Sequence, residues 1–408
     1  MNDVPKNKTG MFHEGACSPW RKVETGLELL AKSLFCLDNE NIGPGWEPCM
    51  REPGKLEQTL ILSGHRDTIR TGTMLIRCDI HQDNGIEDLA RSRVFGDFFK
   101  ARGYQIAFAV RKSSYVQARQ FLGEETTLYR LPEQEDEELE RIGHLQRVHG
   151  HRVIFINMIA ANSAYLFHIR RLFDHVIFFD HGAKYLIYAD IILNPSIAAA
   201  NHPCNCNPEA RLLLGPKFHI CSPTPSPPPD QFSLQYILLN LGNKEDPAFP
   251  VLAALASLKK APIVHVLCDR TSKIPVKLRA FKETYPDLDV HPVIKSDSEA
   301  FPYERYPFII TTANIHCLDF VRAGLFFVTL AAYQDQLEQA YGLHQLGVSP
   351  TLGWFPSKKT VEVARHLEQY LQDPKTRTGF VQSGKALIDG GGLSRMAHFI
   401  PAEASPKS

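Results

Sequence analysis

Residues 74–110 read MLIRCDIHQDNGIEDLARSRVFGDFFKARGYQIAFAV, and they contain two apolar runs on either side of a more polar stretch. Within that stretch, Leu89, Val94 and Phe98 recur at helical spacing. Gly103 stands where such a helix can end, just before the second apolar run. A helix between two short apolar runs is the pattern of a parallel βαβ unit. This stretch therefore predicts an α/β fold.

The same alternation continues on both sides of residues 221–230, CSPTPSPPPD, which are rich in proline. Proline continues neither a helix nor a central strand, so this segment is expected to be a stiff linker. Apolar runs typical of buried parallel strands occur at 151–160, 174–180, 189–194, 236–242, 262–269, 307–313 and 325–331. Helices are expected at 247–260, 336–347 and 358–371. We therefore predict two Rossmann-like domains, 73–220 and 231–390, whose parallel sheets face a cleft.

The two ends of the chain do not share this pattern. Residues 1–72 form an N-terminal extension whose fold the sequence does not identify. Within it, 19–37 has the spacing of an amphipathic helix and 56–62 could form a short strand. The tail, 391–408, is expected to be partly disordered.

The composition is that of a globular protein. Hydrophobic residues make up 44% and charged residues 22% of the 408, which excludes a disordered chain, a collagen and a long coiled coil. Lys+Arg and Asp+Glu both number 45, so net charge attracts the chain neither to nucleic acid nor to anionic membrane. The polar start MNDVPKNKTG does not resemble a signal peptide, and no apolar run is long enough for a membrane span. We predict a soluble, cytoplasmic protein without a nucleic-acid partner, and leave its oligomeric state open.

The nine cysteines, an odd number in a long chain, argue against a disulfide framework. Five side chains of the types that bind zinc stand close together: His202, Cys204, Cys206, His219 and Cys221. The Cys-x-Cys spacing is tighter than in common zinc sites, so a loop with incidental thiols is favoured over structural zinc. We therefore assign no metal ligand. The chain also lacks the P-loop, GxSxG, HExxH and GxGxxG motifs, and we expect no cofactor.

Polar residues after the strands are the candidates for chemistry, because ligands of open α/β sheets bind at the carboxyl ends of the strands. The turn after the first strand is crowded with Asp79, His81, Asp83, Glu87 and Asp88. The acids there are either helix caps or carboxylates that act as a general base or bind a sugar. The acid-rich run 132–145 is expected to be a solvated helix face, with a binding tail as the alternative.

The second predicted domain carries further candidates. Gly242 allows a tight turn whose backbone N–H groups could face a phosphate. Asp319, on a helix after a polar strand end, could accept both hydroxyls of a ribose. Gln336, at the start of the next helix, could reach a phosphate or a sugar hydroxyl. The alternative is that these groups are helix caps and surface polar residues.

Several fragments, in this order, resemble the sugar-nucleotide hydrolase family of pseudaminic acid biosynthesis and the related spore-coat polysaccharide proteins. They are RCDIHQDNGIEDLARSRVFGDFFKARG, FFDHGAKYLIYADIILNPS, RLLLGPKF, ILLNLGNKEDP, and the stretch with AYQDQLEQA and LHQLG. Together they extend from about residue 74 to residue 347. These families are relatives of the GT-B glycosyltransferases. The resemblance therefore implies two Rossmann-like domains and a UDP-sugar in the cleft between them.

The resemblance also implies roles for single residues. Asp79 and Asp88 are the candidate catalytic residues, and Asp88 stands where the family has its catalytic histidine. The nucleotide would be bound by Gly242, Asn243, Asn314, Asp319 and Gln336. The sugar would be bound by Gly85, Arg91, Asp180 and Asp335.

The sequence departs from the family at points that matter for catalysis. The Asp-His-Tyr strand end of the family is replaced by Asn157-Met158-Ile159, and the Gly-Gly turn by Gly242-Asn243. An aspartate with a pKa near ~3.9, such as Asp88, is a poor base at neutral pH unless burial or a neighbour such as Glu87 raises that pKa. The leading hypothesis is hydrolysis of a UDP-sugar at its anomeric carbon with release of UDP. The alternatives are a catalytically inactive binding module and a glycosyltransferase.

Overall fold

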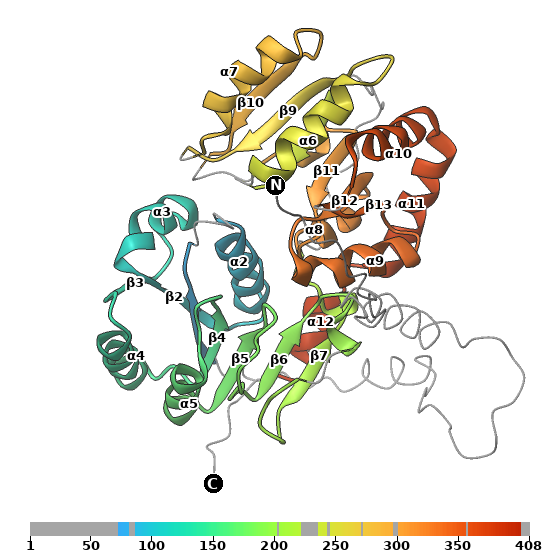
Figure 1. Cartoon of the computed structure of the whole chain (residues 1–408). Helices are drawn as coiled ribbons and strands as arrows, with labels where there is room; N and C mark the ends of the chain where they lie inside the picture. Colours follow the sequence, from blue (N-terminus) through green and yellow to red (C-terminus); the bar gives the residue numbers. More distant parts are fainter. Residues whose placement is uncertain are drawn as a thin grey trace, which may run out of the picture. The chain divides into compact units, whose positions relative to one another are not determined.

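The computed structural model describes residues 72–80, 86–201, 204–221, 236–242, 245–270, 272–296, 301–355 and 358–400. The expected helix at 19–37, the expected strand at 56–62 and almost all of the proline-rich linker lie outside these residues. The described part of the chain forms two parallel β-sheets with helices packed on them (Figure 1).

The first sheet has seven strands in the order β3-β2-β1-β4-β5-β6-β7. They are β1 (Thr73–Cys78), β2 (Gln105–Arg111), β3 (Leu128–Leu131), β4 (Val153–Asn157), β5 (His175–Phe179), β6 (Ile191–Asn194) and β7 (Arg211–Leu214). Its helices are α2 (Glu87–Lys100), α3 (Lys112–Leu122), α4 (Glu135–His149) and α5 (Ser163–Leu172), followed by the 3₁₀ turns η2 (Ala199–Asn201) and η3 (Pro216–Phe218). The strand order reverses between β1 and β4, and ligands of open α/β sheets bind at such switch points.

The second sheet has six strands in the order β10-β9-β8-β11-β12-β13. They are β8 (Tyr236–Asn240), β9 (Ile263–Cys268), β10 (Val290–Ile294), β11 (Phe308–Thr312), β12 (Phe327–Ala331) and β13 (Thr351–Trp354). Its helices are α6 (Glu245–Ala256), α7 (Ile274–Thr284), α8 (Cys317–Ala323), α9 (Leu337–Gln345), α10 (Thr360–Gln372) and α11 (Pro374–Leu387), with 3₁₀ turns η4 (Tyr303–Arg305) and η5 (Gln334–Gln336). The order reverses here between β8 and β11.

Both faces of the first sheet are buried, which explains why its strands are apolar without alternation. Met74 and Ile76 of β1 enter one hydrophobic core, and Leu75 between them enters the core on the opposite face. The strands of both sheets pair in parallel throughout, for example Met74 with Val153 in β4. The prediction of two Rossmann-like α/β domains is therefore confirmed.

One expectation about local structure needs correction, and a second is made more specific. The acid-rich run does form a helix, α4, but Glu138 within it is fully buried and is not part of a solvated face. The tail contains a helix, α12 (Gly392–Ala397), and Leu393 and Met396 pack in the same core as Met74 of the first sheet. Among the described residues, no helix has the length and apolar character needed to cross a membrane.

Candidate functional site

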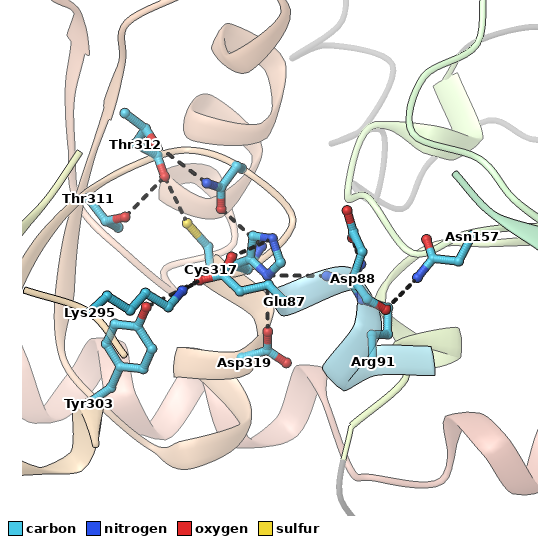
Figure 2. A network of polar contacts seen from close by, with 12 residues as sticks. Glu87, Asp88, Arg91, Asn157, Lys295, Tyr303, Thr311, Thr312, Cys317 and Asp319 are labelled. Atoms are coloured by element: carbon cyan, nitrogen blue, oxygen red, sulfur yellow. Dashed lines mark hydrogen bonds and ion pairs between the residues drawn. The ribbon is translucent and has the colours of Figure 1, made fainter. Parts of the chain in front are cut away.

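The candidate site lies where the first turn of α2, which follows β1, meets the turn before α8, which follows β11 (Figure 2). Glu87 Oε2 forms an ion pair with His316 Nε2 at 2.8 Å, and Glu87 Oε1 forms another with Lys295 Nζ at 2.5 Å. Tyr303 donates its hydroxyl to Glu87 Oε1 at 3.3 Å. Glu87 belongs to the first domain and its three partners to the second, so these contacts join the two domains.

Arg91 connects this group to the interior of the first domain. Its Nη1 donates to Asp88 Oδ1 at 2.6 Å, and its guanidinium lies 4.8 Å from the centre of the Phe179 ring. Its Nη2 lies 3.2 Å from His316 Nδ1. Asp88 and Arg91 are only 3% and 5% exposed. The carboxylate of Asp88 is therefore held in a buried ion pair.

Asp319 contacts one histidine from each domain. His219, which follows η3 in the first domain, has its Nε2 2.7 Å from Asp319 Oδ1, and His316 Nδ1 lies 3.6 Å from Asp319 Oδ2. The Asp319 side chain is nevertheless 46% exposed, so the carboxylate remains accessible to a ligand. We refer to Glu87, Arg91, His219, Lys295, Tyr303, His316 and Asp319 as the interdomain cluster.

The charges of the interdomain cluster set its protonation states. Burial disfavours a charge on His316, and Arg91 opposes it too, but Glu87 and Asp319 outweigh both and raise the pKa of His316 to about 9. Burial likewise disfavours ionisation of Glu87, but His316 and Lys295 lower its pKa well below the usual range. The pKa of Asp319 is also lowered, against the effect of burial, by contacts with His219 and His316. At neutral pH both carboxylates are ionised and His316 is a cation.

A second polar cluster lies beneath the carboxyl end of β1, wholly within the first domain. Arg77 donates from Nε to Glu138 Oε1 and from Nη2 to Asp79 Oδ2, each at 2.7 Å. Tyr165 donates to Glu138 Oε1 and Arg111 Nε to Glu138 Oε2, also at 2.7 Å. Asp79 Oδ1 accepts the backbone N–H of Arg111 at 2.8 Å. We refer to Arg77, Asp79, Arg111, Glu138 and Tyr165 as the β1 cluster.

A cavity of about 160 Å³ borders the β1 cluster, and both predicted catalytic residues line it. Its lining residues are Asp79, Ile80, Asp88, Arg111, Ser113, Ser114, Glu133, Asn157, Met158, Ile159 and Ala160. The cavity is smaller than the ~300–1,000 Å³ pockets that hold drug-sized ligands, so it has room for one ring rather than for a whole nucleotide sugar. Carboxylates, hydroxyls and a guanidinium in its wall suit a ligand rich in hydroxyls.

His181 lies beside the cavity, at the end of β5. Its Nε2 is 2.8 Å from Oδ1 of Asn157, which lines the cavity. The Nδ2 of Asn157 donates to the backbone O of Asp88 at 2.9 Å and to Ser92 Oγ at 3.0 Å. Burial lowers the pKa of His181 to about 4. At neutral pH the imidazole of His181 is therefore uncharged.

Some of the predicted site residues make contacts within their own turns. Asp180 accepts the backbone N–H groups of Gly182 and Ala183 at 2.8 and 2.7 Å. Gln336 accepts that of Ala332 at 2.9 Å, and Asn314 accepts that of His316 at 3.0 Å. Asp335 lies in η5, and Gly242, with a φ of 63°, lies in the turn after β8. Gly85 and Asn243 lie outside the described residues.

Sequence reasoning brings Asp88, Arg91 and Asp319 forward, but it misses His181, His219, Lys295, Tyr303 and His316 as members of a site. The sequence indicates His219 only as a possible zinc ligand. The available signal was a histidine directly after a strand end, at His181, or just before a predicted helix, at His316. Such a local pattern does not identify which side chains from the other domain will contact the histidine.

The possible zinc ligands do not converge in the part of the chain that the structure describes. No three His, Cys, Asp or Glu side chains there are arranged to hold a metal ion. His219 pairs with Asp319, and Cys221 is buried in a core of the second domain. Cys204 and Cys206 pack against a core of the first domain instead. His202 lies outside the described residues.

Comparisons with known proteins identify relatives in structure and not in sequence. No protein-family model matches the chain, and no curated protein sequence matches it. Three solved structures illustrate the structural similarity. MurG of Acinetobacter baumannii matches 81% of this chain and 99% of its own, with a TM-score of 0.56 and 12% identity.

A structure of S. aureus MnaA with UDP matches 83% of this chain and 99% of its own, with a TM-score of 0.57 and 10% identity. The calicheamicin glycosyltransferase CalG4 matches 81% of this chain and 97% of its own, with a TM-score of 0.53 and 11% identity. At such low identity the similarity concerns the fold alone. Since each match spans both parallel sheets, the chain has the two-domain GT-B fold that occurs in glycosyltransferases.

Proposed function

We propose that this protein binds a UDP-sugar between its two Rossmann-like domains and cleaves the anomeric C–O bond, with release of UDP. The proposal extends the resemblance to the sugar-nucleotide hydrolases of pseudaminic acid and spore-coat polysaccharide biosynthesis. The observation that carries it is the meeting of the two halves of the predicted site. Arg91, which is paired with Asp88, lies 3.2 Å from His316, and His316 lies 3.6 Å from Asp319.

The charges of the interdomain cluster support a diphosphate at this place. Lys295 and His316 are cations from the second domain, and Arg91 adds one from the first. Glu87 is the anion that Lys295 and His316 share, whereas Arg91 is paired with Asp88. A diphosphate oxygen can replace the carboxylate of Glu87, because both are anionic oxygens that accept charge-assisted hydrogen bonds.

The cavity beside the cluster supports the sugar half of the proposal. Asp79 and Asp88 line it, and each is already neutralised by an arginine, so the cavity favours an uncharged polyol over a free ion. On the nucleotide side, Asp319 is accessible enough to meet a ribose. Among the similar structures, MnaA was solved with UDP and the glycosyltransferase VinC with DTDP. Those ligands make nucleoside diphosphates the first probes to use.

The test is a thermal-shift titration of the full chain with UDP, DTDP, GDP and CMP, followed by an assay of UDP release from UDP-sugars. A ligand at 100 times its Kd adds about 2.7 kcal/mol to the free energy of unfolding, which raises the Tm by several degrees. UDP should shift the Tm of the wild type and of the exposed control Asp287→Asn, but not that of Asp319→Ala. The absence of a shift with every nucleotide would contradict the proposal.

Glu87 provides a sharper version of the same experiment. If Glu87 occupies the position of the diphosphate, Glu87→Gln should bind UDP several-fold more tightly, because the competing negative charge is gone. The matched control is Glu283→Gln, which removes one negative charge from the exposed face of α7. Equal UDP affinity in the wild type and in Glu87→Gln would place the diphosphate elsewhere.

A catalytically inactive nucleotide-sugar binder is the second candidate, and one observation favours it. Asp88, at the position of the family's catalytic histidine, is ion-paired with Arg91 and is only 3% exposed. A carboxylate held in this way is a weak base. Turnover that falls by orders of magnitude in Asp88→Ala, with UDP affinity retained, would support an enzyme that uses Asp88. The inactive binder would show UDP binding and no turnover in any variant, and the glycosyltransferase alternative would require an acceptor.

A further inference from the structure

We propose that His181 is the general base of this hydrolysis, with Asn157 holding its imidazole so that the Nδ1 lone pair takes a proton from the attacking water. The inference rests on the proposed function and adds to it a catalytic and a positioning residue. Neither role follows from the resemblance, which places the base at Asp88.

The contacts of Asn157 determine which nitrogen of His181 carries the proton. The Nδ2 of Asn157 faces the backbone O of Asp88 at 2.9 Å, and a carbonyl oxygen can only accept. The amide oxygen Oδ1 therefore faces His181 Nε2 at 2.8 Å. Because Oδ1 is also only an acceptor, Nε2 must be the donor, and in a neutral imidazole the lone pair is then on Nδ1. The Nδ1 atom makes no hydrogen bond to any residue that the structure describes.

The surroundings of His181 keep it neutral. Burial is the largest effect on its pKa, which falls to about 4; Arg91 and His316 also lower it, and Asp88 and Asp180 oppose them. A base must be unprotonated before it can act, and His181 meets this condition throughout the physiological range. A bound diphosphate would bring negative charge close to the imidazole and raise its pKa toward neutrality, where a general base is most effective.

The backbone after β5 holds His181 in place. Asp180 accepts the N–H groups of Gly182 and Ala183, and its second oxygen accepts Asn194 Nδ2 at 2.9 Å. Gly182 has a φ of 94°, which a residue with a Cβ rarely adopts. These hydrogen bonds and the glycine conformation fix the backbone on either side of His181.

The location of His181 suits attack at the anomeric carbon. On one side it is bonded to Asn157, a residue of the cavity wall. On the other side its ring lies 4.9 Å from that of Phe179, and the guanidinium of Arg91 lies 4.8 Å from the same Phe179 ring. With the sugar in the cavity and the diphosphate at the interdomain cluster, the bond between sugar and phosphate would lie between these two groups. The contacts of His181 connect it to both places, through Asn157 to the cavity wall and through Phe179 to Arg91.

The step balances without a further reactant. The water oxygen forms a bond to the anomeric carbon as His181 Nδ1 takes one of its protons. The bond between the anomeric carbon and the phosphate oxygen breaks, and its electron pair stays on UDP. The imidazolium then returns its proton to solvent, which leaves the free sugar, UDP and the starting enzyme.

The first test compares turnover with binding. We expect His181→Ala to lower UDP release from UDP-glucose, UDP-galactose or UDP-N-acetylglucosamine by about 10²–10⁴-fold, the usual contribution of a general base, and to leave the UDP-induced Tm shift in place. His168→Gln, at an exposed histidine on α5, is the matched control and should retain full activity. Asn157→Asp keeps an acceptor for Nε2 and should retain more activity than Asn157→Leu, which has none. Added imidazole should restore part of the turnover of His181→Ala.

The second test is independent of turnover. Nitrogen NMR of the wild type at pH 7 should report His181 as neutral with its proton on Nε2, and the Asn157→Leu variant should lose that preference. A proton on Nδ1, or a charged His181, would overturn the inference. UDP binding with wild-type turnover in His181→Ala, or with no turnover in the wild type, would also overturn it and leave nucleotide binding intact. Failure of the wild type to bind UDP would instead reject the proposed function itself.

Discussion

The β1 cluster and the interdomain cluster contain the same kinds of side chains, but they are built differently. Arg77, Glu138 and Tyr165 of the β1 cluster have at most 1% of their surface exposed, and all come from one domain. In the interdomain cluster, Lys295 and Glu87 have side chains that are 17% and 24% exposed, and they come from different domains. The centre of the first cluster is closed to water, and only its rim residues Asp79 and Arg111, each with a side chain 22% exposed, reach the cavity. In the second cluster the exposed residues are those that pair across the two domains.

This difference shows what each cluster can do. In the β1 cluster, both oxygens of Glu138 and the guanidinium of Arg77 are paired inside the domain, so a rearrangement would leave a buried charge without compensation. In the interdomain cluster, the proposed diphosphate would take the place of the Glu87 carboxylate. The buried Nδ1 of His219 there has no hydrogen-bond partner among the described residues. Buried charge alone therefore does not identify a functional site, whereas charge that bridges two domains is a better guide.

The largest loss in the free energy of unfolding is expected when an ion pair of the β1 cluster is removed. Glu138→Ala leaves Arg77 buried without its main partner, and removal of one member of a buried ion pair typically costs about 3–5 kcal/mol. Urea and thermal unfolding should show this loss. Glu137→Ala, at the exposed neighbouring position on α4, should change stability by less than about 0.5 kcal/mol. Equal stability of the two variants would remove the distinction between the clusters.

The next largest effect is the pH dependence of stability, which should differ between the two clusters. The pKa of His316 is about 9 in the folded protein, above ~6.5 for an unperturbed histidine. Its protonation therefore contributes stability that is fully present below pH ~6.5 and is lost as pH rises through about 9. The contribution is up to about 3 kcal/mol, since each pKa unit corresponds to ~1.4 kcal/mol. The pKa of Arg77 is raised and that of Glu138 lowered, so this buried pair of the β1 cluster stays ionised over the same range.

The measurement is the difference in Tm between the wild type and His316→Gln from pH 6 to pH 10. The wild type should be the more stable protein at pH 6, and the difference should shrink toward pH 10. The subtraction removes the titration of lysines, tyrosines and cysteines that the two proteins share. A difference that stays constant with pH would contradict a raised pKa for His316.

A smaller loss of stability should follow when the packing of α12 against the backbone of His219 is disturbed. A Cβ on Gly392 of α12 would lie 2.3 Å from the backbone O of His219, so Gly392→Ala must push the two segments apart. We expect a loss of about 1–3 kcal/mol, as for other overpacked sites, together with weaker UDP binding through Asp319. Gly379→Ala on α11 meets nothing within 4 Å and should leave the Tm equal or higher, since alanine favours a helix. A Tm for Gly392→Ala as high as that of Gly379→Ala would show that α12 is not needed there.

The smallest effect compares one hydroxyl in each cluster. Tyr165→Phe removes a buried hydrogen bond of 2.7 Å to Glu138, which should cost about 1–2 kcal/mol. Tyr303→Phe removes a longer bond of 3.3 Å to Glu87, which keeps Lys295 and His316, and should cost less than about 1 kcal/mol. Denaturant midpoints of the two variants give the comparison directly. A larger loss of stability in Tyr303→Phe than in Tyr165→Phe would contradict the view that the β1 cluster is the more important of the two for stability.

Much of the fold could be predicted because central parallel strands are apolar on both faces. β1, β4, β5, β11 and β12 are of this kind, and the sequence pattern identifies each of them. Sequence analysis does not predict β3, β7, β10 and β13, each of which is short or irregular. β10 is an edge strand that contains Pro292 and exposes His291, so its pattern does not resemble that of a buried strand.

The candidate site was predictable only in its separate halves. Asp88 and Asp319 follow strands, and that position is visible in the sequence. The ion pair of Glu87 with Lys295 joins residues that are 208 positions apart, and no local pattern connects them. The same holds for His219 and Asp319, which are 100 positions apart. Periodicity reports which face of an element is buried, and it carries no information about which distant element covers that face.

The amino-acid sequence by itself determined the α/β class, the two-domain organisation and the turns that bear polar residues, because these depend on contacts within short segments. The tertiary structure decided that Glu138 is buried, that α12 packs in the core of the first domain, and that His181 meets Asn157. It also decided that the local pair of Asp88 and Arg91 is buried. Burial and pairing between distant elements set the charge and pKa of each group, and these properties exist only once the two domains have folded together.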